Sequence, residues 1–190
     1  MKKYVIDGVH GSGKSELLDL LGKKISIFSL DLDEINKYFI DGEFKKPKTE
    51  RRILPYLRNS FLDCQKAIFK IKCEWEDSSY KSAAQKNWPV IQAGSSISTL
   101  AYMMSESKTD EFDSAAIEKR ANENRYDVVF LLKFTPKKMM LPSEYECRIK
   151  LENTLIDVYK QFRYDVIGIA KDNVDARLET VLSYVEAEKK

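Results

Sequence analysis

Glycines, a lysine and a serine near the start of the chain are spaced to bind phosphate. Residues 8–15 read GVHGSGKS and match the phosphate-binding pattern G-x-x-x-x-G-K-[ST] at every fixed position. In such a loop, backbone N–H groups and a helix N-terminus point at one anion. The lysine reaches the β- and γ-phosphates and the serine hydroxyl ligates Mg²⁺. The residues expected to contact the nucleotide are Gly8, His10, Gly11, Ser12, Gly13, Lys14 and Ser15, with Ser15 as the metal ligand.

The residues on either side of this loop determine whether the match has structural meaning. Residues 4–7 are short, apolar and β-prone, and residues 15–21 have the pattern of an amphipathic helix. A strand, a glycine loop and a helix in this order are typical of a true phosphate-binding loop. The alternative is a glycine-rich turn without a ligand.

Composition limits the class of protein. With 190 residues, 43% hydrophobic and 33% charged, we expect one globular domain spanning residues 1–190. The net charge of +2 requires neither a nucleic acid nor a membrane as partner. No apolar run approaches the ~20 residues of a membrane span. The three cysteines lack metal-ligand spacing and are expected to be reduced, so we expect a cytoplasmic protein.

Apolar runs alternate with helical patterns along the rest of the chain. Further strands are predicted at 25–30, 88–93, 126–132 and 165–169. Helices are predicted at 34–40, 49–84, 97–104, 111–122, 143–162 and from about 173 to 186, with a break of the long helix near 77–79 and a capping box formed by Ser143 and Glu146. This alternation predicts a three-layer α/β/α fold, a P-loop NTPase fold with a five-stranded parallel sheet.

Polar residues follow several predicted strands, where a parallel sheet would bring them to one edge. Asp31 and Asp33 follow the second strand, and either could accept the proton of an attacking hydroxyl or cap the next helix. Lys137 and Lys138 follow the fourth strand, and Arg148 lies on the helix after it; all three are candidates for stabilising a transferring phosphate. The alternatives are a solvated basic loop and an ion pair between Arg148 and Glu144.

The order of these segments resembles the small P-loop kinases. The resemblance is to the nicotinamide-riboside-kinase-like AAA domain family and to its neighbours, the deoxynucleoside and thymidylate kinases. Besides the phosphate-binding loop, it rests on residues 100–102, 125–132 and 164–167. It implies ATP as phosphoryl donor, Mg²⁺, and a small nucleoside or nucleotide as acceptor. These kinases usually carry Asp-Arg or Glu-Arg just after the third strand, whereas this chain has Gln-Ala-Gly-Ser-Ser at 92–96 and Ser98 where a further acidic residue is common.

This departure leaves several functions open. Either the acidic cluster after the second strand took over the role of the missing carboxylate, or the protein binds a nucleotide without efficient transfer. A nucleic-acid acceptor is possible but not favoured. It rests on a basic run formed by Lys45, Lys46, Lys48, Arg51, Arg52 and Arg58. The aromatics Tyr38, Phe39, Phe44 and Phe61 could stack on an acceptor ring, although core packing is the ordinary role for such residues.

Overall fold

A five-stranded parallel sheet forms the centre of the computed structural model, which describes residues 1–37, 61–105, 114–136, 140–170 and 173–187. The strands are β1 (Lys3–Asp7), β2 (Phe28–Asp31), β3 (Val90–Ala93), β4 (Val128–Leu132) and β5 (Val166–Ile169). Their order across the sheet is β2-β3-β1-β4-β5, and every neighbouring pair is parallel. β1 therefore lies in the middle, and the loop that follows it opens at the centre of the sheet edge.

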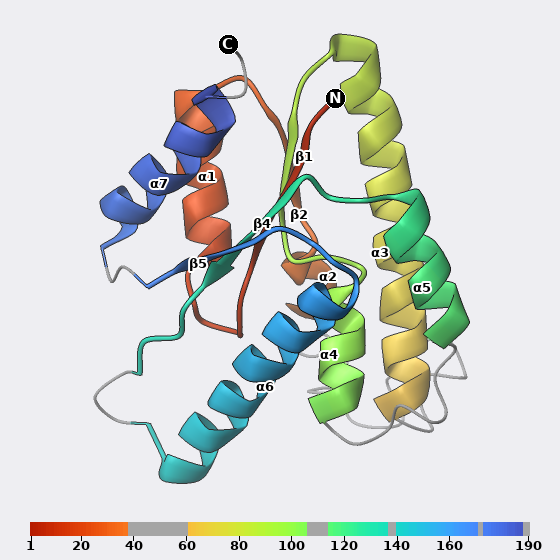
Figure 1. Cartoon of the computed structure of the whole chain (residues 1–190), viewed down its shortest axis with the longest axis vertical. Coiled ribbons are helices and arrows are strands. Elements are labelled where there is room, and N and C mark those ends of the chain that lie inside the picture. Colours follow the sequence, from red (N-terminus) through yellow and green to blue (C-terminus); the bar gives the residue numbers. More distant parts are fainter. Residues whose placement is uncertain (38–60, 106–113, 137–139, 171–172, 188–190) are drawn as a thin grey trace, which may run out of the picture.

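Helices cover both faces of the sheet (Figure 1). On one face lie α1 (Lys14–Lys24) and α7 (Val174–Ala187), and on the other lie α3 (Phe61–Lys86), α4 (Ser98–Ser105), α5 (Ser114–Glu123) and α6 (Pro142–Gln161). The short α2 (Asp33–Lys37) follows β2. The predicted three-layer P-loop NTPase fold with five parallel strands is confirmed.

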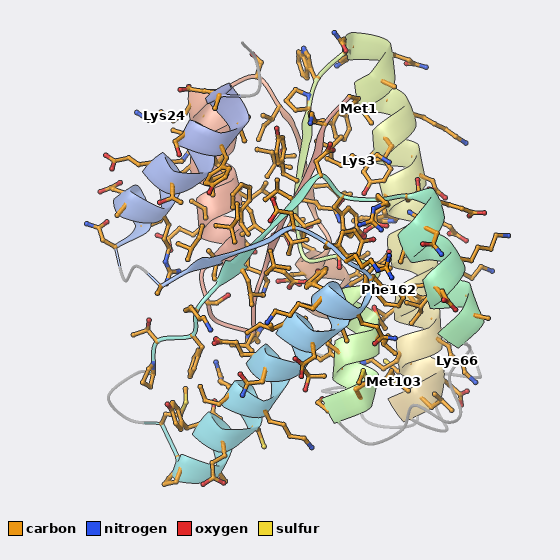
Figure 2. The ribbon with its side chains drawn as sticks, in the orientation of Figure 1. Met1, Lys3, Lys24, Lys66, Met103 and Phe162 are labelled. Carbon is orange, nitrogen blue, oxygen red and sulfur yellow. The ribbon has the colours of Figure 1, made fainter. Side chains whose placement is uncertain are left out.

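Two apolar clusters explain why the strands read as continuous hydrophobic runs. Alternate residues of β1 pack to opposite faces: Val5 joins the cluster under α3 to α6, and Ile6 joins the cluster under α1 and α7. β4 is buried along its whole length, as expected for a strand covered on both faces. Figure 2 shows side chains filling the space between the sheet and the helices.

Two local predictions were wrong. α3 runs unbroken from Phe61 to Lys86, so residues 77–79 do not divide it. α6 begins at Pro142, whose fixed φ suits a first helical position, and no side chain caps it, so the capping box of Ser143 and Glu146 does not form. Among the described residues, no helix is both long enough and apolar enough to cross a membrane.

Candidate functional site

The loop between β1 and α1 has the backbone of a phosphate-binding loop. Gly8, Gly11 and Gly13 have positive φ angles of 147°, 81° and 93°. Gly8 shows why a side chain is not tolerated: a Cβ there would lie 2.7 Å from the Leu132 carbonyl oxygen. α1 begins directly after Gly13, so its N-terminus faces the loop.

Lys14 lies at the centre of the site. Its side chain is only 4% exposed, and Nζ donates hydrogen bonds to the carbonyl oxygens of Gly8 at 2.6 Å and Val9 at 3.1 Å. Nζ also forms an ion pair with Asp33 Oδ2 at 2.9 Å. The loop thus holds a buried ammonium group that pairs with a carboxylate from the segment after β2.

Asp31 and Asp33 have different surroundings, which the sequence left undecided. Asp31 Oδ1 accepts the backbone N–H of Asp33 at 2.9 Å, which is a local turn contact at the start of α2. Asp33 instead reaches Lys14, and its side chain is 18% exposed. Burial by itself would raise the pKa of Asp33, but Lys14 and then Lys72 outweigh burial and hold its pKa below the usual value.

The end of β3 leaves room for the Asp33 carboxylate. Gly94 has φ +74°, and a Cβ at this position would lie 2.8 Å from Asp33 Oδ1. Asp33 therefore occupies the space that a side chain at the end of β3 would fill. The Asp33 carboxylate, at the start of α2, thus packs against the backbone of Gly94, directly after β3.

A second buried lysine, Lys72 of α3, contacts the turn that follows β3. It is 1% exposed, and Nζ donates to the Ser95 carbonyl oxygen at 3.2 Å. Burial lowers the pKa of Lys72, while Asp33, Asp7 and Glu76 act in the opposite direction.

Asp7, the last residue of β1, is also buried beneath the loop. Its Oδ1 accepts the Gly8 N–H at 2.8 Å and its Oδ2 accepts the Tyr159 hydroxyl. The Tyr159 and Ser95 hydroxyls are 2.7 Å apart. Burial raises the pKa of Asp7, partly offset by Lys14. Hydrogen bonds therefore link the start of the loop to the segment after β3.

Glu76 of α3 also contacts the turn that follows β3. It is fully buried, and its carboxylate accepts the Ser96 N–H at 3.0 Å, the Ser96 hydroxyl at 2.8 Å and the Gln92 side-chain amide at 2.8 Å. Arg120 of α5 pairs with it at 2.7 Å, and the Tyr126 hydroxyl donates to it at 2.8 Å. The turn after β3 is therefore fixed by a buried ion pair.

Two arginines donate hydrogen bonds to the backbone of the phosphate-binding loop. Arg148 of α6 donates to the His10 carbonyl oxygen and pairs with Glu144, so the expected i,i+4 ion pair is present as well. Arg177 of α7 is buried and donates to the Ser12 carbonyl oxygen. Both guanidinium groups therefore bond carbonyl oxygens of the loop backbone.

Several predicted site residues lie outside the described residues. These are Lys137 and Lys138, the basic run from Lys45 to Arg58, and the aromatics Tyr38, Phe39 and Phe44, while the Phe61 side chain is likewise not described. Among the described aromatics, Tyr102 of α4 is half-buried, and its pKa is raised by burial and by the nearby charges of Asp33 and Asp7.

Sequence reasoning missed Lys72 and Glu76, although a signal was present. Ile68, Lys72, Glu76 and Tyr80 are four residues apart along α3, and all are buried. Two charged residues on the stripe that must face the core, and not on the solvent side, were the clue.

The residues present fit a nucleotide and its magnesium ion. The Ser12 hydroxyl is buried and, within the described part of the chain, has no hydrogen-bond partner, as expected for a group facing a ligand. Ser15, in the first turn of α1, would supply a hydroxyl to Mg²⁺. Among the described residues, no cluster of three or more His, Cys, Asp or Glu side chains could hold a metal ion.

Comparison with known proteins identifies proteins with the same fold and a family that matches this chain. A search of curated proteins finds no match. Thymidylate kinase from Ehrlichia chaffeensis has the same fold with a TM-score of 0.63 and 13% identity, covering 97% of this chain and 98% of that one. Deoxyadenosine kinase from M. mycoides with bound dATP has a TM-score of 0.54 and 20% identity, covering 98% and 100%. A NadR protein in complex with NR has a TM-score of 0.65 and 15% identity, covering 90% of this chain and 44% of that one. The family model described as an AAA domain matches residues 3–177, and the chain belongs to that family.

Proposed function

We propose that the protein is a kinase that transfers the γ-phosphoryl group of ATP to a small nucleoside, nucleotide or related hydroxyl compound. The observation that carries the proposal is the ion pair between Lys14 and Asp33 at 2.9 Å, because it brings a carboxylate from the end of β2 to the phosphate-binding lysine. The names of the proteins that share the fold, thymidylate kinase and deoxyadenosine kinase, support the acceptor class.

In this proposal the acceptor oxygen attacks the γ-phosphorus, and the bond to the ADP oxygen breaks. The proton of the acceptor hydroxyl passes to the Asp33 carboxylate, which is partly exposed and, since its pKa is held low, ionised at neutral pH. Lys14 turns from Asp33 to the phosphates and balances their charge. Bound Mg²⁺ would neutralise charge on the phosphates.

A screen for ADP production tests this function. The protein with Mg-ATP is offered nucleosides, nucleotides and oligonucleotides in turn. We expect turnover with one class of small acceptor, loss of turnover in Lys14→Ala and Asp33→Asn, and full turnover in the exposed control Lys66→Met. Unchanged turnover in Lys14→Ala would refute the site assignment.

The alternative is a nucleotide-binding protein without efficient transfer. It is favoured by residues 92–96, which carry neither the carboxylate nor the arginine that related kinases have there. Nucleotide binding without ADP production from any acceptor would support it. An oligonucleotide acceptor would instead show binding with steep salt dependence, since each neutralised phosphate releases counterions.

A further inference from the structure

Lys72 is a buried cation to which the proposed reaction gives no role. It is 1% exposed, lies on α3 and bonds a carbonyl oxygen outside the phosphate-binding loop. A lysine loses several kcal/mol of hydration when buried unless anions compensate. The position of Lys72 therefore needs an explanation from its surroundings.

Those surroundings point to Asp33. The Lys72 amine bonds the Ser95 carbonyl oxygen at 3.2 Å, and the neighbouring Gly94 lies against Asp33 Oδ1. Asp33 Oδ2, the other carboxylate oxygen, faces Lys14. One oxygen of this carboxylate thus pairs with a lysine from α1, and the other lies against the turn whose next residue, Ser95, is bonded by a lysine from α3.

The two lysines differ in what a nucleotide would do to them. Lys14 belongs to the phosphate-binding loop, so bound phosphate would draw it from Asp33. Lys72 is held by a backbone carbonyl outside this loop and would stay. Once Lys14 has turned to the phosphate, Lys72 is the remaining lysine that acts on Asp33. Without Lys72, the largely buried Asp33 carboxylate would have Asp7 nearby and neither of these two lysines to balance its charge.

We propose that Lys72 is the positioning residue that keeps Asp33 ionised and in place when Lys14 moves to the phosphates. The inference rests on the proposed function. Among the described residues, the charged and titratable groups around Asp33 include Lys14 of α1, Lys72 of α3, His10 of the loop, Asp7 of β1, Asp31 of β2 and Tyr102 of α4.

The test is proton uptake on nucleotide binding, which does not depend on turnover. Lys72→Met removes the charge and keeps the length of the side chain. Since the loss of a nearby cation raises the pKa of a carboxylic acid, Asp33 should take up a proton when Lys14 leaves it. Calorimetry of Mg-ADP binding at pH 7 in buffers of different ionisation enthalpy measures this uptake. Lys66→Met, on the same helix but at its exposed face (Figure 2), is the matched control.

We expect up to one additional proton per bound nucleotide in Lys72→Met relative to wild type and Lys66→Met. The nucleotide's own protonation cancels in this comparison. The double variant Asp33→Asn/Lys72→Met should return to the wild-type proton count. An unchanged count in Lys72→Met, with Mg-ADP still bound, would overturn the role of Lys72 but not the proposed function. Failure of wild type to bind Mg-ADP would overturn both.

Folding of the variants gives a second criterion. If Lys72→Met does not fold, the double variant decides, because it removes the carboxylate that Lys72 balances. Recovery of a cooperative unfolding transition in the double variant would support the pairing, and failure of both variants to fold would overturn it.

Discussion

Replacement of Asp33 by asparagine should separate nucleotide binding from turnover. Lys14 is paired with Asp33 at 2.9 Å, with side-chain exposures of 4% and 18%. In the proposed function, nucleotide binding breaks this pair, because Lys14 turns to the phosphates. Asp33→Asn removes the pair in advance and also removes one negative charge beside the phosphates, so the nucleotide should bind more tightly.

The size of this effect follows from the burial of the pair. Breaking a fully buried ion pair costs about 3–5 kcal/mol, and an exposed pair contributes about 0–1 kcal/mol. Asp33 is partly exposed and Lys14 keeps two carbonyl partners, so a value of about 2 kcal/mol is reasonable. It corresponds to roughly 30-fold tighter Mg-ADP binding. Turnover should fall by about 10²-fold or more, because the proton acceptor is lost.

Calorimetry of Mg-ADP binding and steady-state ADP production measure the two effects. Asp31→Asn is the control, since its contact is a turn hydrogen bond that the asparagine oxygen can still accept; neither quantity should change appreciably. If Asp33→Asn binds Mg-ADP equally or more weakly, then Asp33 does not compete with phosphate for Lys14, and this reasoning fails.

Three further predictions address the groups around the site. Glu76→Gln breaks the buried pair with Arg120 and should lower the free energy of unfolding by about 3 kcal/mol in urea denaturation, whereas Asp77→Asn, at a 47% exposed partner of the same arginine, should cost less than about 1 kcal/mol; similar losses would contradict the assigned burial. Gly94→Ala should lower turnover while the protein stays folded by circular dichroism, because its Cβ would displace Asp33, and unchanged turnover would refute the fit. Burial raises the pKa of Asp7, so its contribution to stability is present at low pH and is lost as pH rises through the folded-state pKa. The melting temperature of Asp7→Asn minus that of wild type should therefore rise from acidic to neutral pH, and a difference that falls over this range would contradict this sign.

The fold was predictable because each strand is encoded locally. Runs such as residues 128–132 are buried on both faces, so their whole sequence is apolar and requires no knowledge of distant partners. The phosphate-binding loop was predictable for a similar reason, since its glycines and Lys14 are contiguous. Boundaries moved by a few residues where helix starts depend on local geometry, as at Pro142.

The remainder of the site depends on contacts between distant segments. Asp31 and Asp33 are two residues apart and chemically identical, so only the position of Lys14 and the absence of a side chain at Gly94 distinguish them. Lys72 lies in a helix whose general pattern is amphipathic. Its importance becomes visible only when the register of α3 against β3 shows that it faces inward.

The position of the Asp33 carboxylate depends on the absence of a side chain at Gly94. A carboxylate at the end of β3 and a carboxylate reaching over from β2 would compete for the same volume, since a Cβ at residue 94 would lie 2.8 Å from Asp33 Oδ1. Two carboxylates so close would also repel one another and raise the pKa of one of them. The position of Asp33 therefore requires that residue 94 has no side chain. The difference from related kinases at residues 92–96 does not by itself indicate an inactive site. In the proposed role of Lys72, the cation beside that carboxylate comes from α3, whose lysine bonds the carbonyl oxygen of Ser95 on the same turn.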